Sequence, residues 1–416
     1  MRTVHIVRKY DLAEWGGTET AVQRLLHGLA GERVDSVLYC PSLNGATSSR
    51  VPVESGFAVK HFKTCVPVWG LTPEAKRQFV SLGGNLFSFD LLTALWREEK
   101  FDLIHTHTLG RLGAMAGAAA RHRHVPFVVT IHGGFLDLPA PMKQEFSTPP
   151  QVGFDWGRLF GFLLRSRQML HAADALLTCN PSEAAMLRQA FPGKRVEVQP
   201  HGIPVSRYRE DCRNAARIAW PQLCGREVLL CVGRIDPVKN QAWLVEQAPQ
   251  IFLKHPNTML VLAGPFTDEA YSAAIRTRVA ELALSHHILF TGALPPGDSR
   301  LIGLLQRASA LVLPSVSETF GLVLLEAWAA GTTVISSRTS GASALVKHGE
   351  NGWLFNLDNP AFFHAAVDAV LGQPELRTRL AAAGNAKAVA EFDVPAIARR
   401  VRQFYHQLIE AKSCAT

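Results

Sequence analysis

Short apolar runs rich in β-branched residues alternate with longer segments of helical periodicity along nearly the whole chain. In the first half these runs are RTVHIV (2–7), VDSVLYC (34–40), FDLIHTH (101–107), PFVVTIHG (126–133), ADALLTCN (173–180) and RVEVQPHGI (195–203). The helical segments between them include TETAVQRLLHGLAG (18–31) and LGRLGAMAGAAARHR (109–123). Continuous apolar runs with helices between them indicate parallel strands that are covered on both faces.

The same alternation restarts in the second half. Its strand-like runs are EVLLCVGRI (227–235), TMLVLAGP (258–265), HILFTGAL (287–294), ALVLPS (310–315) and TTVISS (332–337). Two such blocks predict an α/β protein with two Rossmann-like, doubly wound parallel-sheet domains. The Gly and Pro residues of QPHGIPVSRYRE mark the boundary, so the predicted domains are residues 1–202 and 203–393. Residues 394–416 are expected to form an amphipathic helix, whose return to the first domain is left open.

Residues 140–158 are irregular and carry several prolines, which predicts a loop ahead of a helix over 159–173. Arg158, Arg165 and Arg167 stand beside large apolar residues in and next to this helix. Two interpretations fit that pattern. The segment either makes peripheral contact with an anionic membrane or packs on the protein's own sheet with its arginines exposed.

Composition restricts the partners and the compartment. The chain of 416 residues has a net charge of +8 and a pI near 9.2, which favours an anionic partner. Because its Lys and Arg residues are scattered, we expect no nucleic acid; a sugar nucleotide or an anionic lipid fits better. Seven cysteines without a CxxC pair indicate reduced thiols. With no membrane-spanning run and no signal-peptide pattern, we expect a cytoplasmic protein, with membrane association as an alternative.

Polar residues follow several strands, at the edge where open parallel sheets bind ligands. After the first strand, Gly16 and Gly17 of WGGTET precede a helix, where backbone N–H groups can approach a phosphate closely. A simple turn also explains the glycine pair. Glu19 is expected to cap this helix rather than to do chemistry.

The first strand of the second block leads into CVGRIDPVKN. Arg234 and Lys239 follow Gly233 there, and such a pair of cations suits a pyrophosphate. A surface loop with two solvated bases is the alternative.

Glu318 and Glu326 form the most specific pattern in the chain. Glu318 lies in a turn after ALVLPS, and Glu326 lies inside the apolar helix GLVLLEAWAAG. An unpaired buried carboxylate is costly, and ribose hydroxyls would satisfy Glu326. The helix is expected to start near Phe320 or Gly321, where its N–H groups can meet phosphate oxygens.

Together these motifs resemble the retaining family-four glycosyltransferases with the GT-B fold, in which two such domains face a central cleft. The matching pieces are WGGTET, FDLIHTHTLG, VVTIHGG, CVGRIDPVKN, VLAGP, FTGAL and LPSVSETFGLVLLEAWAAGTTVISSRTSGASALVKHGENGWLF. They stand in the family's order and cover nearly the whole chain, with the second half matching more strongly.

The resemblance implies a role for each matched residue. Glu318 would orient the donor sugar, and Glu326 would hold the ribose. Arg234 and Lys239 would neutralise the departing diphosphate, and His132 would face the reacting sugar. The other implied donor-binding positions are Gly16, Gly17 and Gly233, with the backbone of Phe320, Gly321 and Leu322.

No metal and no cofactor are expected, because cations and a helix terminus stabilise a departing diphosphate and the sequence has no Asp-x-Asp motif. Retention follows if the acceptor attacks from the side that the diphosphate leaves, and then neither glutamate is a nucleophile. His105 and His107 have a spacing that suits a metal, but no third ligand is evident, so a packed strand end is the favoured interpretation.

Two other segments vary the family's pattern. His201 of QPHGIP stands where the family often has asparagine, and we interpret it as part of the hinge between the domains. IPV then replaces the usual hydrophobic residue and aspartate. Ser340 and Gly341 belong to a glycine-rich loop near the donor sugar, although they also suit an ordinary turn.

The predicted function is transfer of a hexose-type sugar from a nucleoside-diphosphate donor to an acceptor hydroxyl, in polysaccharide, glycolipid or glycoconjugate synthesis. The acceptor is expected to be a glycan or lipid-linked, and its choice is assigned to the first domain, including residues 140–158. Two alternatives remain. One is a sugar-nucleotide epimerase of the same architecture, and the other is a non-catalytic subunit that binds a sugar nucleotide.

Overall fold

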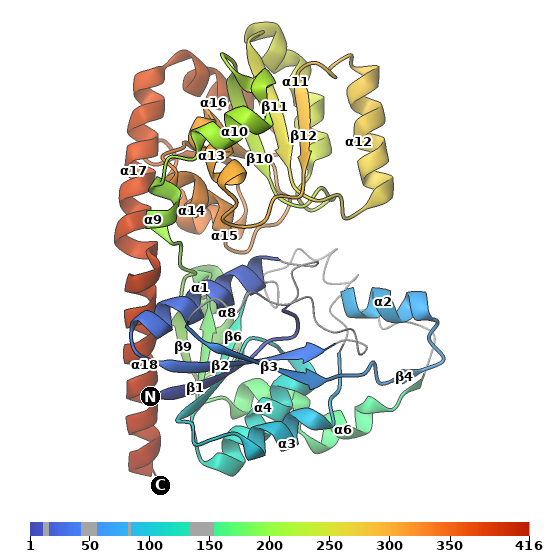
Figure 1. The fold of residues 1–416 in the computed structure, drawn as a ribbon, viewed down its shortest axis with the longest axis vertical. Helices are drawn as coiled ribbons and strands as arrows, with labels where there is room; N and C mark the ends of the chain where they lie inside the picture. Colours follow the sequence, from blue (N-terminus) through green and yellow to red (C-terminus); the bar gives the residue numbers. More distant parts are fainter. Residues whose placement is uncertain (11–15, 43–55, 82–84, 134–153, 416) are drawn as a thin grey trace. The chain divides into compact units, whose positions relative to one another are not determined.

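The computed structural model describes residues 1–10, 16–42, 56–81, 85–133 and 154–415. The chain divides into two compact units. Unit 1 comprises Met1–His201 and Pro395–Thr416, and unit 2 comprises Gly202–Val394. Each unit has its own parallel sheet flanked by helices (Figure 1).

Unit 1 contains a seven-stranded sheet in the order β3-β2-β1-β5-β6-β8-β9, in which all neighbours are parallel. Because β1 lies between β2 and β5, the topological switch point is at the carboxyl ends of β1 and β5. The strands are β1 (Arg2–Ile6), β2 (Asp35–Ser42), β3 (Ala58–Lys63), β5 (Leu103–Thr106), β6 (Phe127–Ile131), β8 (Ala175–Thr178) and β9 (Arg195–Val198). Two short strands, β4 (Val68–Trp69) and β7 (Phe154–Asp155), form a separate antiparallel pair.

Helices cover both faces of this sheet, because successive side chains of a strand point to opposite sides. Val4 and Ile6 pack in one core with α3 and α4, whereas Val7 packs in a second core with α1 and α18. The helices of unit 1 are α1 (Gly17–Gly31), α2 (Pro73–Ser81), α3 (Asp90–Arg97), α4 (Gly110–Arg123), α6 (Gly157–Leu163), α7 (Met169–Ala172), α8 (Pro181–Ala190) and α18 (Val394–Ala415).

The terminal helix α18 contributes an apolar stripe to the second core of unit 1. Ile397, Val401, Tyr405 and Leu408 recur at helical spacing in that core, and each is at most 6% exposed. The Lys412 ammonium adds an ion pair of 2.8 Å with Asp174. No helix in the described part of the chain is both long and apolar enough to cross a bilayer.

Unit 2 contains a six-stranded parallel sheet in the order β12-β11-β10-β13-β14-β15. Its switch point lies at the carboxyl ends of β10 and β13. The strands are β10 (Glu227–Val232), β11 (Thr258–Ala263), β12 (Ile288–Gly292), β13 (Ala310–Leu313), β14 (Val334–Ser337) and β15 (Trp353–Phe355). The helices are α9 (Val205–Arg209), α10 (Arg213–Ala219), α11 (Gln241–Lys254), α12 (Glu269–Glu281), α13 (Ser299–Arg307), α14 (Leu322–Ala329), α15 (Ser340–Leu345), α16 (Pro360–Gly372) and α17 (Pro374–Phe392).

The chain enters and leaves unit 2 at one place. The Ile203 N–H donates to the Phe392 carbonyl at 2.8 Å, and the Val394 N–H donates to the Ile203 carbonyl at 3.1 Å. Asp393 also accepts from the Val205 N–H at 3.4 Å, at the start of α9. Asp393, near the C-terminal end of unit 2 in the sequence, therefore contacts Val205. Val205 is the first residue of α9 and the last residue of IPV, the segment that lacks the family's aspartate.

The prediction of one continuous helix over 159–173 is wrong. The helix breaks at Arg165, whose left-handed backbone (φ 52°) ends α6; a 3-10 turn at Ser166–Gln168 and the short α7 follow. Most of the loop expected over 140–158 lies outside the described residues. Four strands were not predicted: the edge strand β3, in which only Phe62 is buried, the three-residue β15, and the short pair β4 and β7. None of them gives an apolar run longer than three residues.

Candidate active site

Lys239 and Glu318 meet at the switch point of unit 2. Lys239 follows β10 and Glu318 follows β13, and these two strands are neighbours in the sheet. The Lys239 Nζ lies 2.5 Å from Glu318 Oε2, and the two side chains are 21% and 15% exposed. The structure thus brings together a cation and a carboxylate that stand far apart in the sequence, at the edge where this type of sheet binds ligands.

Asp236 shapes the loop that carries the two cations. Its carboxylate accepts a hydrogen bond of 2.9 Å from the Lys239 N–H and lies 3.0 Å from the Arg234 guanidinium. Asp236 is 8% exposed, whereas the Arg234 side chain is 57% exposed. Sequence reasoning missed this residue, although an aspartate before proline between the two cations is a signal for a structured turn.

The turn that carries Glu318 is held by the glycine-rich loop expected near the donor sugar. The Gly341 N–H donates to the Glu318 carbonyl at 2.8 Å, and a Cβ at Gly341 would lie 2.6 Å from that oxygen and 2.5 Å from the Phe320 nitrogen. Ser340 Oγ lies 3.4 Å from the same carbonyl. Both residues therefore support the turn.

Helix α14 begins at Leu322, one or two residues later than the expected start near Phe320 or Gly321, because Gly321 adopts a left-handed backbone (φ 89°) as its N-cap. Phe320 is 4% exposed, so its side chain belongs to the core and only its backbone is a candidate for ligand contact. Glu326 lies within α14 and is 7% exposed. Gly233 leads from β10 into the cation loop, with the Lys239 side chain beside it.

In unit 1, Gly16 is the N-cap of α1 and Gly17 its first residue. The Gly16 N–H donates to Glu19 Oε2 at 2.9 Å, and the Thr20 hydroxyl donates to the Gly16 carbonyl at 2.9 Å. The expected capping role of Glu19 is confirmed. Gly16 has extended rather than left-handed backbone, so its flexibility is not required by the turn itself. Burial raises the pKa of the Glu19 carboxyl.

Histidines gather at the carboxyl ends of the central strands of unit 1. His132 follows β6, and its Nε2 lies 3.0 Å from Nδ1 of His107. His107 in turn lies 3.1 Å from His5 of β1, measured from Nε2 to Nδ1. His201 stacks on His132 with ring centroids 5.2 Å apart. The sequence did not predict this cluster, because His5 and His201 come from other parts of the chain.

His5 lies where the third ligand of a metal site with His105 and His107 would have to be, and the sequence analysis did not identify it. One nitrogen from each of His5, His105 and His107 lies within 4.8 Å of the others. Both ring nitrogens of each residue already have hydrogen-bond partners, however, at 2.5–3.1 Å. This geometry is that of a satisfied polar network at a strand end.

Two family models match the chain. "Glycosyltransferase Family 4" matches residues 15–207, and "Glycosyl transferases group 1" matches residues 216–387. A "Glycogen synthase" of Mycobacterium tuberculosis is 30% identical over 67% of this chain and 68% of its own length. The chain is a family-four glycosyltransferase. A "D-inositol 3-phosphate glycosyltransferase" of Frankia alni is 28% identical over 96% of both proteins.

Solved structures show that this glycosyltransferase has the expected GT-B fold. Sucrose-phosphate synthase from Thermosynechococcus elongatus has a TM-score of 0.74 at 22% identity, with 99% of both chains covered. Anabaena Alr3699/HepE in complex with UDP and glucose has a TM-score of 0.73 at 17% identity and covers 98% of this chain and 100% of its own. The predictions of family, fold and glycosyltransferase activity are confirmed.

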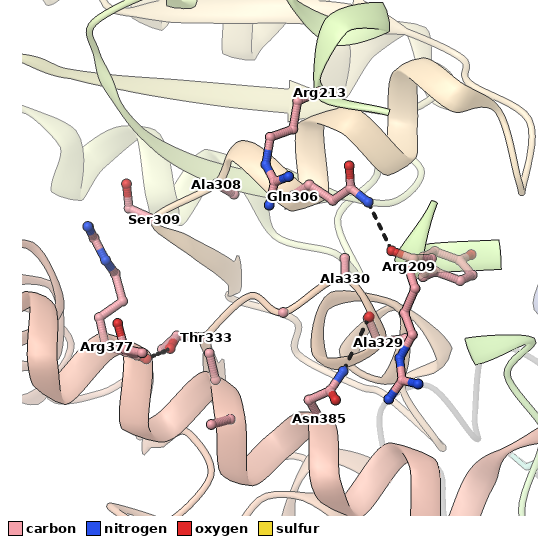
Figure 2. Close-up of a pocket in the computed structure, with 15 residues that line it drawn as sticks. Arg209, Arg213, Gln306, Ala308, Ser309, Ala329, Ala330, Thr333, Arg377 and Asn385 are labelled. Atoms are coloured by element: carbon pink, nitrogen blue, oxygen red, sulfur yellow. Dashed lines mark hydrogen bonds between the residues drawn. The ribbon is translucent and has the colours of Figure 1, made fainter. Parts of the chain in front are cut away.

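A separate pocket of about 470 Å³ opens at the opposite edge of the unit 2 sheet of this glycosyltransferase (Figure 2). Ser309 and Thr333 line it and directly precede β13 and β14, so it lies at the amino ends of these strands. Its lining includes Arg209, Arg213 and Arg377 and no described acidic residue. None of the predicted site residues lines this pocket, which separates it from the Lys239–Glu318 pair.

Proposed function

We propose that this glycosyltransferase transfers a hexose from a nucleoside-diphosphate donor to an acceptor hydroxyl, with retention of configuration and without a metal. The ion pair between Lys239 and Glu318 is the observation that carries the proposal. It places a positive charge beside a carboxylate at the switch point of unit 2. A sugar diphosphate needs both groups, because its phosphates are anionic and its sugar hydroxyls donate hydrogen bonds.

Lys239 and Arg234 are assigned to the diphosphate. When the bond from C1 to the phosphate oxygen breaks, negative charge grows on the leaving group, and a fixed cation beside it lowers the barrier. Asp236 holds both the Lys239 backbone and the Arg234 guanidinium, so this loop is pre-organised before the donor arrives. The backbone N–H groups of Gly321 and Leu322, at the N-terminus of α14, add partial positive charge.

Glu318 is assigned to the donor sugar and Glu326 to the ribose. In the donor complex Glu318 accepts hydrogen bonds from sugar hydroxyls, and Lys239 turns to the phosphate. The carboxylate thus gains hydrogen-bond donors and the ammonium gains an anion, which replace the ion pair between them. Gly16 and Gly17, at the start of α1, are assigned to the diphosphate, to which the Gly16 N–H donates once it leaves Glu19 Oε2. His132 is assigned to the transferred sugar.

The chemistry requires no protein nucleophile in this scheme. The acceptor oxygen attacks C1 on the face that the diphosphate leaves, and an oxygen of the diphosphate takes the acceptor's proton. The new glycosidic bond replaces the bond to phosphate on the same face, which gives retention. Glu318 and Glu326 then act by orienting hydroxyls.

A thermal-shift panel of UDP-, GDP- and ADP-sugars identifies the donor, followed by product analysis with acceptors. UDP-glucose is the first donor to test, since the Anabaena structure holds UDP and glucose. An inositol phosphate and a glucan are the first acceptors, from the names of the relatives. Transfer with inverted configuration would overturn the retaining mechanism. Conversion of the donor without any acceptor would indicate an epimerase instead.

An anionic membrane is proposed as a second partner, through α6. Leu159, Phe162 and Leu163 are 62%, 81% and 65% exposed, and Arg158 and Arg165 beside them are exposed as well. Exposed apolar side chains flanked by arginines suit an interface with anionic lipid.

Co-sedimentation with vesicles of phosphatidylglycerol and phosphatidylcholine tests the membrane proposal. Phe162→Asp should reduce the bound fraction several-fold. The control is Leu253→Asp, because Leu253 is 86% exposed in unit 2 and lies outside this surface. Equal binding by the two variants would contradict a membrane role for α6.

A further inference from the structure

A continuous chain of hydrogen-bonded side chains crosses the unit 1 sheet and ends at His132. Ser36 Oγ lies 3.0 Å from Thr3 Oγ1, which lies 3.1 Å from His5 Nε2. His5 Nδ1 lies 3.1 Å from His107 Nε2, and His107 Nδ1 lies 3.0 Å from His132 Nε2. The chain links β2, β1 and the segments after β5 and β6.

The imidazoles of this chain are neutral at pH 7. Burial lowers the pKa of His5 to about 3 and that of His132 to about 4. The pKa of His107 is well below its ordinary value, first because the ring is buried and then because His105, His132 and His5 are close. A neutral imidazole carries one N–H, so it donates from one nitrogen and accepts at the other.

His107 is therefore the directional link in the chain. If its Nδ1 donates to His132, its Nε2 must accept from His5. If its Nε2 donates to His5, its Nδ1 must accept from His132. The position of the proton on His132 is Nδ1 in the first case and Nε2 in the second, so the tautomer of His132 depends on the ring next to it.

We propose that His107 is a positioning residue that selects the tautomer of His132 by holding its Nε2. Any hydrogen bond from His132 to a ligand then uses Nδ1. The consequence for catalysis rests on the proposed function, in which His132 meets the transferred sugar. The stacked ring of His201, inclined by 23° to His132, restrains the ring plane and complements the bond from His107.

His105 provides a matched control within the same cluster. Its ring centroid lies 4.1 Å from that of His107, and the residue is 1% exposed. Its nitrogens bond the Tyr405 hydroxyl at 2.5 Å and the Thr130 hydroxyl at 2.6 Å, so it is close to the chain without belonging to it. A purely structural effect of losing a buried imidazole should appear equally at His105 and His107.

Two substitutions of His107 separate its two contacts. The amide of His107→Asn reaches the position of Nδ1 and keeps a hydrogen bond to His132. The amide of His107→Gln reaches the position of Nε2, so it bonds His5 and releases His132. The readout is the ¹⁵N NMR spectrum of histidine-labelled protein, in which long-range ¹H–¹⁵N couplings distinguish the tautomers, with His132→Gln to assign the resonance.

We expect one tautomer of His132 in the wild type, in His107→Asn and in His105→Gln, and an altered or averaged one in His107→Gln. In sugar transfer, His107→Gln should lower kcat about tenfold to hundredfold, as expected for one misdirected hydrogen bond, with little change in KM for the donor. His107→Asn should retain more activity.

An unchanged His132 spectrum in His107→Gln, or equal losses of kcat in His107→Asn and His107→Gln, would overturn the proposal. The spectrum needs no substrate, so it answers independently of the proposed function. If the wild-type protein transfers no sugar, the comparison of kcat values is lost together with the proposed function. The His132 spectrum alone then decides whether His107 selects the tautomer.

Discussion

The ammonium of Lys239 and the carboxylate of Glu318 lie 2.5 Å apart at the carboxyl ends of two neighbouring parallel strands. Both side chains are mostly buried, which makes this contact more than a solvated surface pair. Each group holds the other in place until a ligand separates them. The pair is therefore where substitutions should distinguish an effect on chemistry from an effect on folding.

Glu318→Gln should lower sugar transfer by at least about 100-fold, because the amide cannot orient the donor sugar as a charged acceptor does. The amide has a similar shape and can still bond Lys239, so the free energy of unfolding should change by only about 1 kcal/mol. Initial rates and urea denaturation of the same preparation measure the two effects. A variant that turns over normally would remove Glu318 from the site.

Lys239→Ala should weaken donor binding and turnover together. The substitution removes the cation beside the proposed diphosphate and leaves Glu318 without its partner. We expect at least about a tenfold loss of affinity for the nucleoside diphosphate, as for one charge-assisted hydrogen bond. Titration calorimetry with the diphosphate alone measures it, and an affinity equal to that of the wild type would contradict the phosphate role.

Gly341→Ala should damage activity and stability because a methyl group there has no room. Its Cβ would lie 2.5 Å from the Phe320 nitrogen and 2.6 Å from the Glu318 oxygen, and these are backbone atoms. Relieving that overlap moves the Glu318 turn and costs roughly 1–3 kcal/mol. Thermal unfolding and transfer rates test this. The control is Gly372→Ala, at a helix end with nothing within 4 Å, which should be tolerated.

The sequence predicted the central strands because their side chains are buried on both faces of each sheet. Val4, Ile6 and Val7 illustrate this, since they pack into different cores from one short run. Edge elements such as β3 were missed, because an edge strand exposes most of its side chains and lacks that run. The central strands could be predicted from the sequence because burial on both faces gives them continuous apolar runs, and not because of β propensity alone.

The candidate site was predictable residue by residue but not as a set of contacts. Gly233, Lys239 and Glu318 each follow a strand, and that could be seen in the sequence. The strand order, which makes β10 and β13 neighbours, could not, so the ion pair between Lys239 and Glu318 was not expected. His5 and His107 are 102 positions apart, and they meet only because β1 pairs with β5.

A chelator should leave sugar transfer intact. The proposed mechanism places Lys239, Arg234 and backbone N–H groups where a metal would otherwise neutralise the diphosphate. We expect the rate with EDTA to lie within about twofold of the rate without it, because these protein cations supply the stabilisation. Loss of activity that magnesium or manganese restores would contradict the metal-free mechanism.

Acid should destabilise unit 1 through its histidine cluster. The pKa of His5 falls from its ordinary 6.5 to about 3 in the folded protein, because the ring is buried. Between these two values the unfolded chain binds a proton that the folded chain does not. The contribution of neutral His5 to the free energy of unfolding is therefore fully present above pH 6.5 and is lost as the pH falls toward 3. The loss is up to about 1.4 kcal/mol per pH unit for each such group.

His132, with a pKa of about 4, adds to the same trend over a narrower range. Hydrogen exchange of peptides from β1 and β5 at pH 7, 6 and 5 would follow unit 1 separately from unit 2. His5→Asn should reduce the slope of the unfolding free energy against pH by the amount that corresponds to about one proton, because its amide can hydrogen-bond but does not titrate. If protection of these strands stayed constant from pH 7 to pH 5, the buried imidazoles would have to be protonated in the folded protein as readily as in the unfolded chain.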